Sequence, residues 1–503
     1  MSASRFRVSL MTCLLLLSVS AEVCFARSKP RDFTAELEKS VPRYLAQYSV
    51  PGAAIAVIRE GKVIWMQGFG FANVAGKRPM TADTVLNVGS ISKTVTAWGV
   101  LHLVAERKLD LDRPINDYLQ RWQVPASSLA VHQVTARRLL SHTGGISQHG
   151  YGGSDPATPA PPIEDSLNGR TGAGSVSLLF PPGSNFAYSG ANYSILQLAI
   201  EEITGQPFPQ YMDAQVLQPL KMSSSTFDLP KDRVNVATPY DAAANPLPLL
   251  RYNETSAAGL MTSLRDVANF AAATLDPPPR VVSRVLIEEA MRPVANTQWA
   301  ARDPFGPAPH YGLGYNVRPE QWGPHTGIGH GGTNTGWESW FQVIPETGDG
   351  IVILTNSSNG SALIASVTCD WRRDRFARQP CPTIDARIPV FAEYRTRGIE
   401  AALELHARLR ARHADEYDLG SRQLNGLGYQ VMRVGDLPAA IRIFELNAKL
   451  FPDEWNVHDS LGEAYAAAKQ KDAAIRSYRR SVELNPGNDN GKQALRKLGQ
   501  EAP

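Results

Sequence analysis

The chain has 503 residues, which is more than one hydrophobic core usually organises, so two domains are expected. Its 51 Lys and Arg residues nearly balance its 48 Asp and Glu residues, and the formal net charge is +3. This balance excludes the strongly basic or acidic classes of protein, so neither nucleic acid nor an acidic membrane surface is expected as the main partner.

The first 26 residues have the layout of a secretory signal peptide. Arg5 and Arg7 precede an apolar run over 8–19, and small residues follow, with cleavage expected after Ala21 or Ala26. The apolar run is short for a bilayer span, and no later run is longer. We therefore expect an exported protein, periplasmic or secreted, without a membrane span in its mature form; an uncleaved anchor is the alternative.

Cysteine usage agrees with export. Cleavage after Ala26 would remove Cys13 and Cys24 and would leave Cys369 and Cys381 as an even pair in an oxidising compartment. A disulfide between them is favoured over two unpaired thiols. No CxxC motif or Cys/His cluster indicates a metal site, and neither a metal nor another cofactor is expected.

Residues 30–390 mix strand, helix and turn signals. The apolar runs 53–58 and 63–70 flank a short charged turn and predict a β-hairpin. Apolar residues at helical spacing over 94–109 predict a helix that begins near Ser90. The following stretch of 150–174 is rich in Gly, Pro, Ser and Thr, which predicts a long surface loop near the functional site.

The last strand signals of this part are a pair of apolar runs, 340–344 and 350–355, joined by a short turn. Residues 30–390 are therefore read as an α/β domain.

From residue 391 to 503 the pattern becomes helical and repeats. Four pairs of residues stand 34 apart: Gly428 and Gly462, Ala440 and Ala474, Phe444 and Tyr478, Pro452 and Pro486. This is the tetratricopeptide period, a helix–turn–helix unit that buries its apolar face by stacking on neighbours. Helical segments 399–410 and 492–498 are expected to complete the stack. The repeats would recruit a protein partner or, alternatively, only pack on the first domain.

Ser90 and Lys93 form an S-x-x-K element where the predicted helix begins. Residues three apart share a helical face, so the Lys93 amine can reach the Ser90 hydroxyl. Desolvation can lower a lysine pKa until it accepts a proton, and a helix N-terminus favours developing negative charge. The motif by itself is weak, because a capping serine and a solvated lysine produce the same pattern.

Other elements follow it in a fixed order. They are Ser90-Ile91-Ser92-Lys93, LLSHTGG at 139–145, FPPG at 180–183, Tyr188-Ser189-Gly190, AGLMTS at 258–263 with Asp266, YGLGY at 311–315, and His330-Gly331-Gly332. In this order they resemble the serine β-lactamase and penicillin-binding D-Ala-D-Ala carboxypeptidase family, especially its class C β-lactamase-like and esterase branch. The resemblance covers nearly all of residues 30–390.

This resemblance implies a role for each matching position. Ser90 would be the acylated nucleophile, with Lys93 as its proton acceptor. Tyr188 would relay a proton to the leaving group, which requires the positive charge of Lys93 to ease its ionisation. The backbone N–H groups of Ser90 and Thr333 would form the oxyanion hole, next to Gly331 and Gly332, where substrate backbone approaches the strand closely.

Two positions depart from the family pattern. Gly190 replaces the family's asparagine, a contact of the substrate amide and of the lysine, and Asn192 cannot be assumed to substitute. His330 replaces the lysine usual in β-lactamases; a neutral imidazole would hold a substrate carboxylate less firmly. His330 is preferred to His325 of a second H-x-G match, and His142 is read as a packing residue.

The sequence therefore predicts an α/β plus all-α architecture. A β-lactamase/transpeptidase-like domain over 30–390, an antiparallel sheet with flanking helices and a helical subdomain, precedes a tetratricopeptide-like helical domain over 391–503. The predicted function is a serine hydrolase acting through an acyl-enzyme on a D-amino-acid peptide, a small ester or amide, or a β-lactam. The alternative is a non-catalytic ligand-binding or scaffold protein of the periplasm.

Overall fold

The structure, a computed structural model, describes residues 32–148, 150–230, 232–297, 309–322, 324–376, 381 and 383–500. The predicted signal peptide, with Cys13 and Cys24, lies outside the described residues. None of the described helices combines the length and apolar character needed to cross a membrane.

The strands of the described residues are β1 Gly52–Arg59, β2 Lys62–Asn73, β3 Arg78–Pro79, β4 Val85–Asn87, β5 Asn168–Gly169, β6 Gly174–Ser175, β7 Met261–Ser263, β8 Ala295–Asn296, β9 His310–Tyr311, β10 Asn316–Trp322, β11 His325–Asn334, β12 Trp337–Ile344, β13 Asp349–Thr355, β14 Ile384–Asp385 and β15 Tyr417–Asp418.

The helices are α1 Phe33–Tyr48, α2 Ile91–Ala105, α3 Ala136–Leu140, α4 Ile163–Leu167, α5 Gly190–Thr204, α6 Phe208–Met212, α7 Thr255–Ala258, α8 Leu264–Leu275, α9 Arg284–Ala290, α10 Gly360–Arg375, α11 Arg387–Arg412, α12 Ser421–Arg433, α13 Leu437–Leu450, α14 Trp455–Ala467, α15 Lys471–Leu484 and α16 Asp489–Lys497, with short helical turns η1 Ile115–Tyr118, η2 Val131–Gln133 and η3 Asp213–Leu217.

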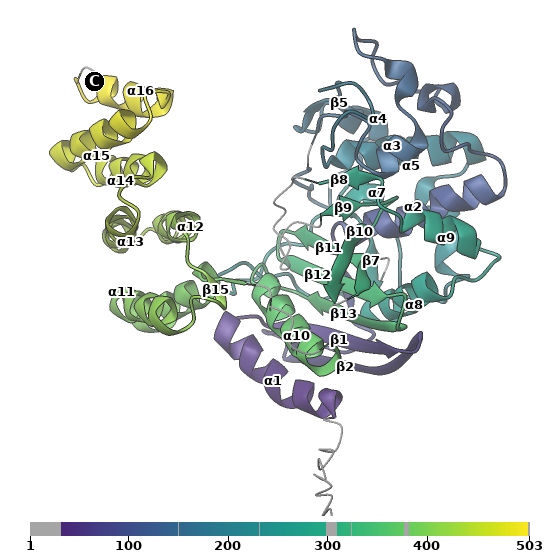
Figure 1. Ribbon diagram of the computed structural model, residues 1–503, viewed down its shortest axis with the longest axis horizontal. Coiled ribbons are helices and arrows are strands. Elements are labelled where there is room, and N and C mark those ends of the chain that lie inside the picture. The colour runs from purple at the N-terminus through teal and green to yellow at the C-terminus, as the bar shows by residue number, and fades with distance from the viewer. Residues whose placement is uncertain are drawn as a thin grey trace, which may run out of the picture.

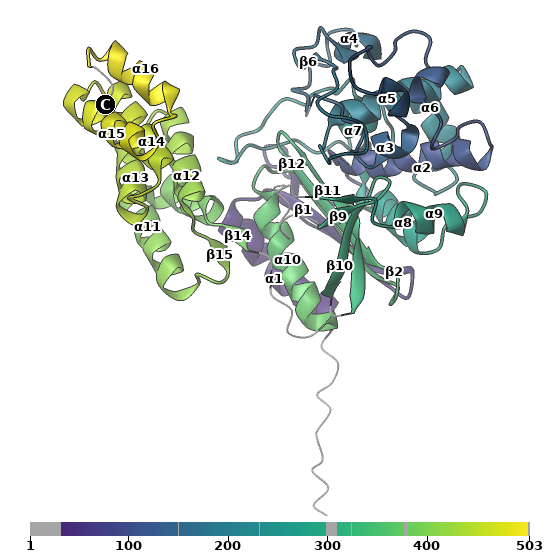
Figure 2. The same cartoon turned by 45° about the horizontal axis from the view of Figure 1, so that its top comes forward.

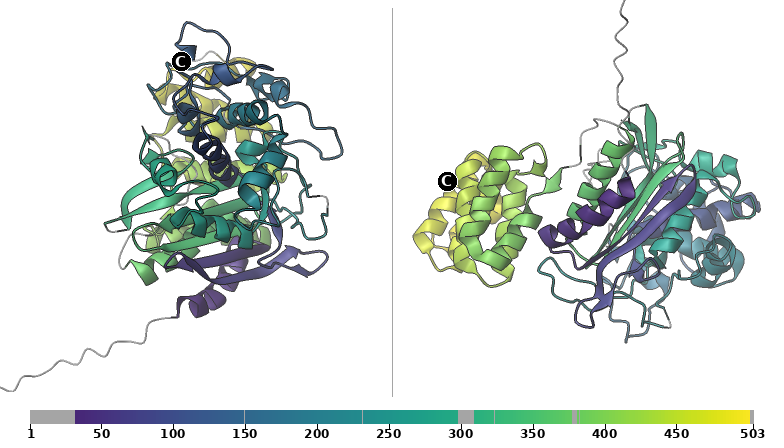
Figure 3. Two further views of the ribbon diagram at one scale, coloured as in Figure 1. Left: turned by 90° about the vertical axis from the view of Figure 1, so that its right-hand side faces the viewer. Right: turned by 90° about the horizontal axis from the view of Figure 1, so that it is seen from below.

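A nine-stranded antiparallel sheet in the order β3-β2-β1-β13-β12-β11-β10-β9-β8 organises the larger part of the chain (Figure 1). Its strands β1 and β13 are continuous apolar runs because both faces of the sheet are covered. Ala54 and Ala56 face a core shared with α2 and α8, whereas Ile55 and Val57 face a second core shared with α1 and α10. The view from below shows these two helices on one face and α8 on the other (Figure 3).

The predicted hairpin is confirmed as β1 and β2. Arg59 pairs with Lys62 across a two-residue turn in which Glu60 and Gly61 both have positive φ. Such a turn matches the twist of antiparallel strands and favours glycine. The second predicted strand pair is confirmed as β12 and β13.

The helix predicted near Ser90 is α2, which ends at Ala105 rather than at residue 109. Its residues 91–103 are all buried, because α2 packs between α5, α7 and β11. A helix that is covered all round carries apolar residues on every face. The apolar pattern therefore does not show where α2 ends, and it continued past Ala105. Figure 2 shows α2 in the helical layer beside the sheet, with α3, α5 and α7.

The stretch 150–174 was predicted as a loop, and this is wrong in part. It contains α4 and β5, and β5 pairs with β6. Backbone hydrogen bonds of 2.8 Å in both directions also join Ser154 to Arg251. The segment is therefore anchored, even though its composition is typical of a loop.

Several helices follow the sheet domain. The predicted boundary at residue 391 falls inside α11, which the non-helical backbone of Gly398 interrupts. Helices α14 and α15 begin 34 residues after α12 and α13, and Gly428 and Gly462 lie against the rings of Phe444 and Tyr478. The 34-residue repeat is thus a repeat of helix pairs; its assignment as a tetratricopeptide domain stays a prediction.

The sheet domain and the C-terminal helices share one apolar core. Side chains of α1, α10 and the outer face of the sheet cluster with those of α11 to α14. A disulfide joins Cys369 on α10 to Cys381, which confirms the disulfide predicted from the sequence. The bond ties α10 to the segment that leads into α11. Figures 1 and 2 show the C-terminal helices beside α1 and α10, away from α2 and α5.

Candidate active site

Ser90 stands at the N-terminus of α2, on a tightly fixed turn. The Gly89 N–H donates to Asn87 Oδ1 at 2.9 Å, and the Ser92 hydroxyl donates to the Gly89 carbonyl at 2.6 Å. Gly89 has a φ of +50°, and a Cβ there would lie 2.7 Å from the Thr333 nitrogen. Glycine is therefore needed at 89, and it brings the Ser90 turn into backbone contact with β11.

Lys93 lies one helical turn beyond Ser90 and points at it. The Lys93 Nζ is 3.1 Å from Ser90 Oγ and 2.7 Å from the Ala257 carbonyl oxygen, and the Tyr188 ring centroid is 5.0 Å away. Only 3% of Lys93 is exposed, and this burial lowers its pKa to about 7. Near neutral pH a large fraction of Lys93 is therefore neutral and able to accept the Ser90 proton.

The Tyr188 side chain completes a three-residue cluster by hydrogen bonding to Ser90. Burial raises the pKa of Tyr188 above its usual range, and the bond to Ser90 only partly opposes this. Burial therefore opposes the ionisation of Tyr188, and the role of Lys93 in easing that ionisation stays a prediction. At neutral pH Tyr188 therefore keeps its proton.

His142 supports Tyr188 from behind. Its ring centroid is 4.2 Å from that of Tyr188, and its Nδ1 accepts from the Ser189 N–H at 3.2 Å and from the Asn192 side-chain amide at 2.9 Å. The Nδ1 atom is thus engaged within the protein, in keeping with a packing role. Asn192 is directed at His142, so it does not replace the amide side chain missing at Gly190.

His330 is buried on β11, with its ring centroid 6.3 Å from that of Tyr188. Its Nδ1 donates to the Gly331 carbonyl at 2.5 Å, and its Nε2 accepts from the Tyr311 hydroxyl at 2.9 Å. Burial lowers the pKa of His330 to about 3, and the charge of Lys93 acts in the same direction. The imidazole is neutral at pH 7. His325 lies at the far end of β11 and packs edge-on against Phe376.

The strand edge from Gly331 to Thr333 lies beside the turn that carries Ser90. A Cβ on Gly332 would be 1.9 Å from the Val88 carbonyl oxygen, so only glycine fits there. In the described residues β10 pairs with β11 no further than Gly329, which leaves this edge without a strand partner on that side. The Thr333 nitrogen adjoins Gly89, so the backbone N–H groups of Ser90 and Thr333 are neighbours, as an oxyanion hole requires.

Gly190 begins α5 and is buried two residues after Tyr188. A Cβ on Gly190 would lie 2.6 Å from the edge of the Tyr151 ring. The Tyr151 ring thus lies where the asparagine side chain of the family pattern would begin at position 190.

Of the predicted site residues, the structure brings Ser90, Lys93, Tyr188, His330, Gly331, Gly332 and Thr333 together, with Gly190 at one border. Sequence reasoning missed three contributors. Ala257 precedes the AGLMTS motif and Tyr311 opens the YGLGY motif, so each had a signal nearby; Tyr151 sits in a low-complexity stretch and had none.

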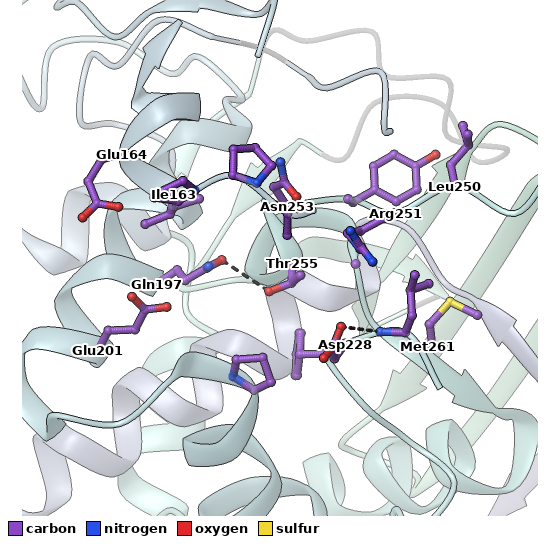
Figure 4. A pocket seen from close by; sticks show the side chains of 18 of the residues that line it. Ile163, Glu164, Gln197, Glu201, Asp228, Leu250, Arg251, Asn253, Thr255 and Met261 are labelled. Carbon is purple, nitrogen blue, oxygen red and sulfur yellow. Dashed lines mark hydrogen bonds between the residues drawn. The ribbon is translucent and has the colours of Figure 1, made fainter. Parts of the chain in front are cut away.

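A separate cavity of about 300 Å³ lies beneath 160–164. Its walls include Glu164, Gln197 and Arg251, and Figure 4 shows Gln197 directed at the Thr255 hydroxyl, 3.4 Å away (Figure 4). None of Ser90, Lys93, Tyr188 and His330 is among its lining residues. The cavity is therefore distinct from the catalytic cluster.

Known proteins resemble the sheet domain. The family model described as beta-lactamase matches residues 37–365. Protein flp of Staphylococcus aureus (strain MW2) is 26% identical over 335 residues, which are 65% of this chain and 63% of that protein; the chain thus spans less than two thirds of this relative. Esterase EstB of Burkholderia gladioli is 31% identical over 201 residues, 38% of this chain and 51% of EstB. The octameric penicillin-binding protein homologue from Pyrococcus abyssi superimposes with a TM-score of 0.59 and 27% identity, over 68% of this chain and 79% of that one.

Proposed function

The chain belongs to the beta-lactamase family, and we propose that it is a serine hydrolase that forms an acyl-enzyme at Ser90. The observation that carries this proposal is the 3.1 Å contact between Ser90 Oγ and the buried Lys93 Nζ. A buried lysine next to a serine hydroxyl, with a pKa of about 7, is an arrangement suited to proton abstraction.

The proposed acylation step uses Ser90 as the nucleophile, Lys93 as the proton acceptor and Tyr188 as the proton donor. Ser90 Oγ attacks the substrate carbonyl carbon while neutral Lys93 takes its proton. The negative charge on the carbonyl oxygen is stabilised by the backbone N–H groups of Ser90 and Thr333. Tyr188, which keeps its proton, donates it to the leaving alcohol or amine, and Lys93 then returns to Tyr188 the proton that it took from Ser90. Water then hydrolyses the acyl-enzyme by the reverse route.

Small esters or amides with an uncharged acyl group are the proposed substrates. His330 is neutral and uses both ring nitrogens within the protein, so it offers no positive charge to a substrate carboxylate. This disfavours D-amino-acid peptides and β-lactams, which carry such a carboxylate. The match to a protein named as an esterase supports the same choice.

The test is hydrolysis of p-nitrophenyl acetate by the purified protein, with Ser90→Ala and Lys93→Met as variants. Both variants are expected to lose at least about a thousandfold in kcat/KM. Ser127→Ala, which changes an exposed serine on a distant loop, serves as the matched control. Hydrolysis that persists in a folded Ser90→Ala protein would refute the assignment.

Intact mass spectrometry tests the acyl-enzyme itself. Incubation with p-nitrophenyl acetate at neutral pH, followed by a rapid acid quench, should add one acetyl group to the wild type and none to Ser90→Ala. Reversible binding without an adduct or turnover would instead support the non-catalytic ligand-binding alternative.

Export and a role for the repeats complete the proposal. We propose that residues 1–26 are removed as a signal peptide, which the N-terminal mass of the secreted protein tests.

We also propose that α11 to α16 form a tetratricopeptide-like stack that recruits a protein partner, with packing on the sheet domain as the competing role. A periplasmic cross-linking experiment that compares the wild type with a Trp455→Ala variant tests recruitment, because Trp455 is an exposed aromatic residue of α14.

A further inference from the structure

The space beside Tyr188 at the start of α5 is filled by an aromatic ring from another part of the chain. Gly190 has no side chain, and the place that its Cβ would take lies 2.6 Å from Cε2 and 3.3 Å from Cζ of Tyr151. Both distances are below or near the limit of real Cβ contacts. Residue 190 and Tyr151 are therefore alternatives: one of them can occupy this volume, and here it is Tyr151.

Tyr151 is held in this position at its hydroxyl. The hydroxyl lies 2.9 Å from Ser194 Oγ, one helical turn beyond Gly190 on α5. An aromatic ring tied at its far end to the same helix cannot swing away without breaking a partly buried hydrogen bond.

The backbone near Tyr151 is fixed as well. Ser154 and Arg251 exchange two backbone hydrogen bonds of 2.8 Å, and the Arg251 guanidinium donates to the carbonyls of Pro156 and Thr158. The Gln148 amide donates to the Ser166 carbonyl at 3.0 Å on the other side. The position of the ring is thus fixed by hydrogen bonds on both sides, although the ring comes from a stretch with the composition of a loop.

We propose that Tyr151 is a specificity-determining residue: it places an apolar ring where an amide side chain at position 190 would bind the substrate's acyl group. The inference rests on the proposed function at Ser90. A ring face satisfies no N–H or C=O, so an acyl group that carries an amide would lose its hydrogen bonds to water without replacement. An alkyl acyl group of the same length loses nothing and gains contact with the ring. The enzyme therefore selects esters of plain alkyl acids over esters of N-acylamino acids.

The preference is measured with two esters of equal chain length, p-nitrophenyl pentanoate and the p-nitrophenyl ester of N-acetylglycine, after subtraction of spontaneous hydrolysis. The readout is the ratio of the two kcat/KM values, which cancels differences in active enzyme. Wild type should prefer the pentanoate by about tenfold or more.

Four variants separate the causes. Tyr151→Ala removes the ring and should lower the ratio several-fold. Tyr151→Ala combined with Gly190→Asn supplies an amide in the vacated space and should lower or invert it. Tyr151→Phe keeps the ring and should keep the wild-type ratio. Tyr118→Ala removes a tyrosine from η1 and is the matched control, also with an unaltered ratio.

An unchanged ratio in both Tyr151→Ala and the double variant, with pentanoate still hydrolysed, would overturn the inference. Should the double variant not fold, Tyr151→Ala against Tyr151→Phe still decides, since only the former loses the ring. Failure of the proposed function looks different: a folded wild type would then hydrolyse neither ester, and Ser90→Ala would behave like it.

Discussion

Gly332 lies directly against Val88: a Cβ on residue 332 would be 1.9 Å from the Val88 carbonyl oxygen and 2.6 Å from Ser339 Oγ. Ser339 Oγ in turn donates to that same carbonyl at 2.8 Å. This close approach holds β11 beside the turn that carries Ser90. The spacing between the nucleophile and the Thr333 N–H therefore depends on the absence of a single methyl group.

Gly332→Ala is predicted to reduce kcat/KM for p-nitrophenyl acetate by about a hundredfold or more, because the added methyl must push β11 away from the Ser90 turn. The loss should lie mainly in kcat, since the oxyanion hole acts on the transition state. Gly420→Ala, where a Cβ would meet only the flexible Asp418 carboxylate at 3.2 Å, is the control. Equal activity of Gly332→Ala and wild type would show that β11 does not set the oxyanion geometry.

The activity is predicted to fall below about pH 7 because Lys93 must be neutral to accept the Ser90 proton. Burial lowers its pKa to about 7, so protonation removes the base as the pH decreases through that value. A plot of log(kcat/KM) against pH should rise with a slope near one below pH 7 and then level off. The check is the same profile in His330→Gln: an acid limb that disappears in this variant would assign the titration to the histidine instead.

His330 is predicted to make the fold acid-sensitive. Its pKa is lowered to about 3 in the folded protein, whereas an unfolded histidine titrates near 6.5. Between these values the unfolded state binds a proton that the folded state does not, so the free energy of unfolding decreases as pH falls below 6.5. Between pH 7 and pH 4.5 this group contributes a loss of about 2 to 3 kcal/mol, whatever the folded pKa is below 4.5.

Urea unfolding of wild type and His330→Gln at both pH values measures this loss. Glutamine keeps hydrogen-bonding capacity and cannot be protonated, so its free energy of unfolding should fall less than that of wild type. Any difference between the two proteins in the free energy of unfolding at pH 7 reflects packing, and it is subtracted from the difference at pH 4.5. Parallel losses in the two proteins would contradict the prediction.

The Cys369–Cys381 disulfide is predicted to stabilise the protein by about 3 kcal/mol, as expected for a crosslink that closes a loop of this length. The double variant Cys369→Ser/Cys381→Ser should unfold at lower urea concentration than the oxidised wild type. Reduced wild type should match the variant, which separates the crosslink from the effect of the substitutions. Hydrolysis of p-nitrophenyl acetate at low temperature should survive, because the bond lies on the face of the sheet opposite Ser90.

Local patterns predicted most of the fold because they report burial along a short stretch. The β1–β2 hairpin follows from two apolar runs around a turn, and the start of α2 follows from helical spacing after Ser90. The end of α2 was misplaced because full burial hides the amphipathic pattern. The anchored elements within 150–174 were missed because their partners, such as Arg251, lie far along the chain.

In the candidate site, too, the local contacts could be predicted from the sequence and the contacts between distant segments could not. Ser90 and Lys93 are one helical turn apart, so their contact is local and was predicted from spacing. The raised pKa of Tyr188 and the Tyr151 ring over Gly190 arise from tertiary packing. No periodicity records which distant side chain fills a vacated volume, so these features needed the three-dimensional structure.

The sheet also works as a partition. Ser90 and α2 belong to the core on one face, whereas α1, α10 and, through them, the C-terminal helices belong to the core on the other. A scaffold that bound α11 to α16 would thus hold the protein on the face of the sheet opposite Ser90. Under the proposed function, partner binding at the tail and hydrolysis at Ser90 would therefore take place on opposite faces of the sheet and need not interfere with each other.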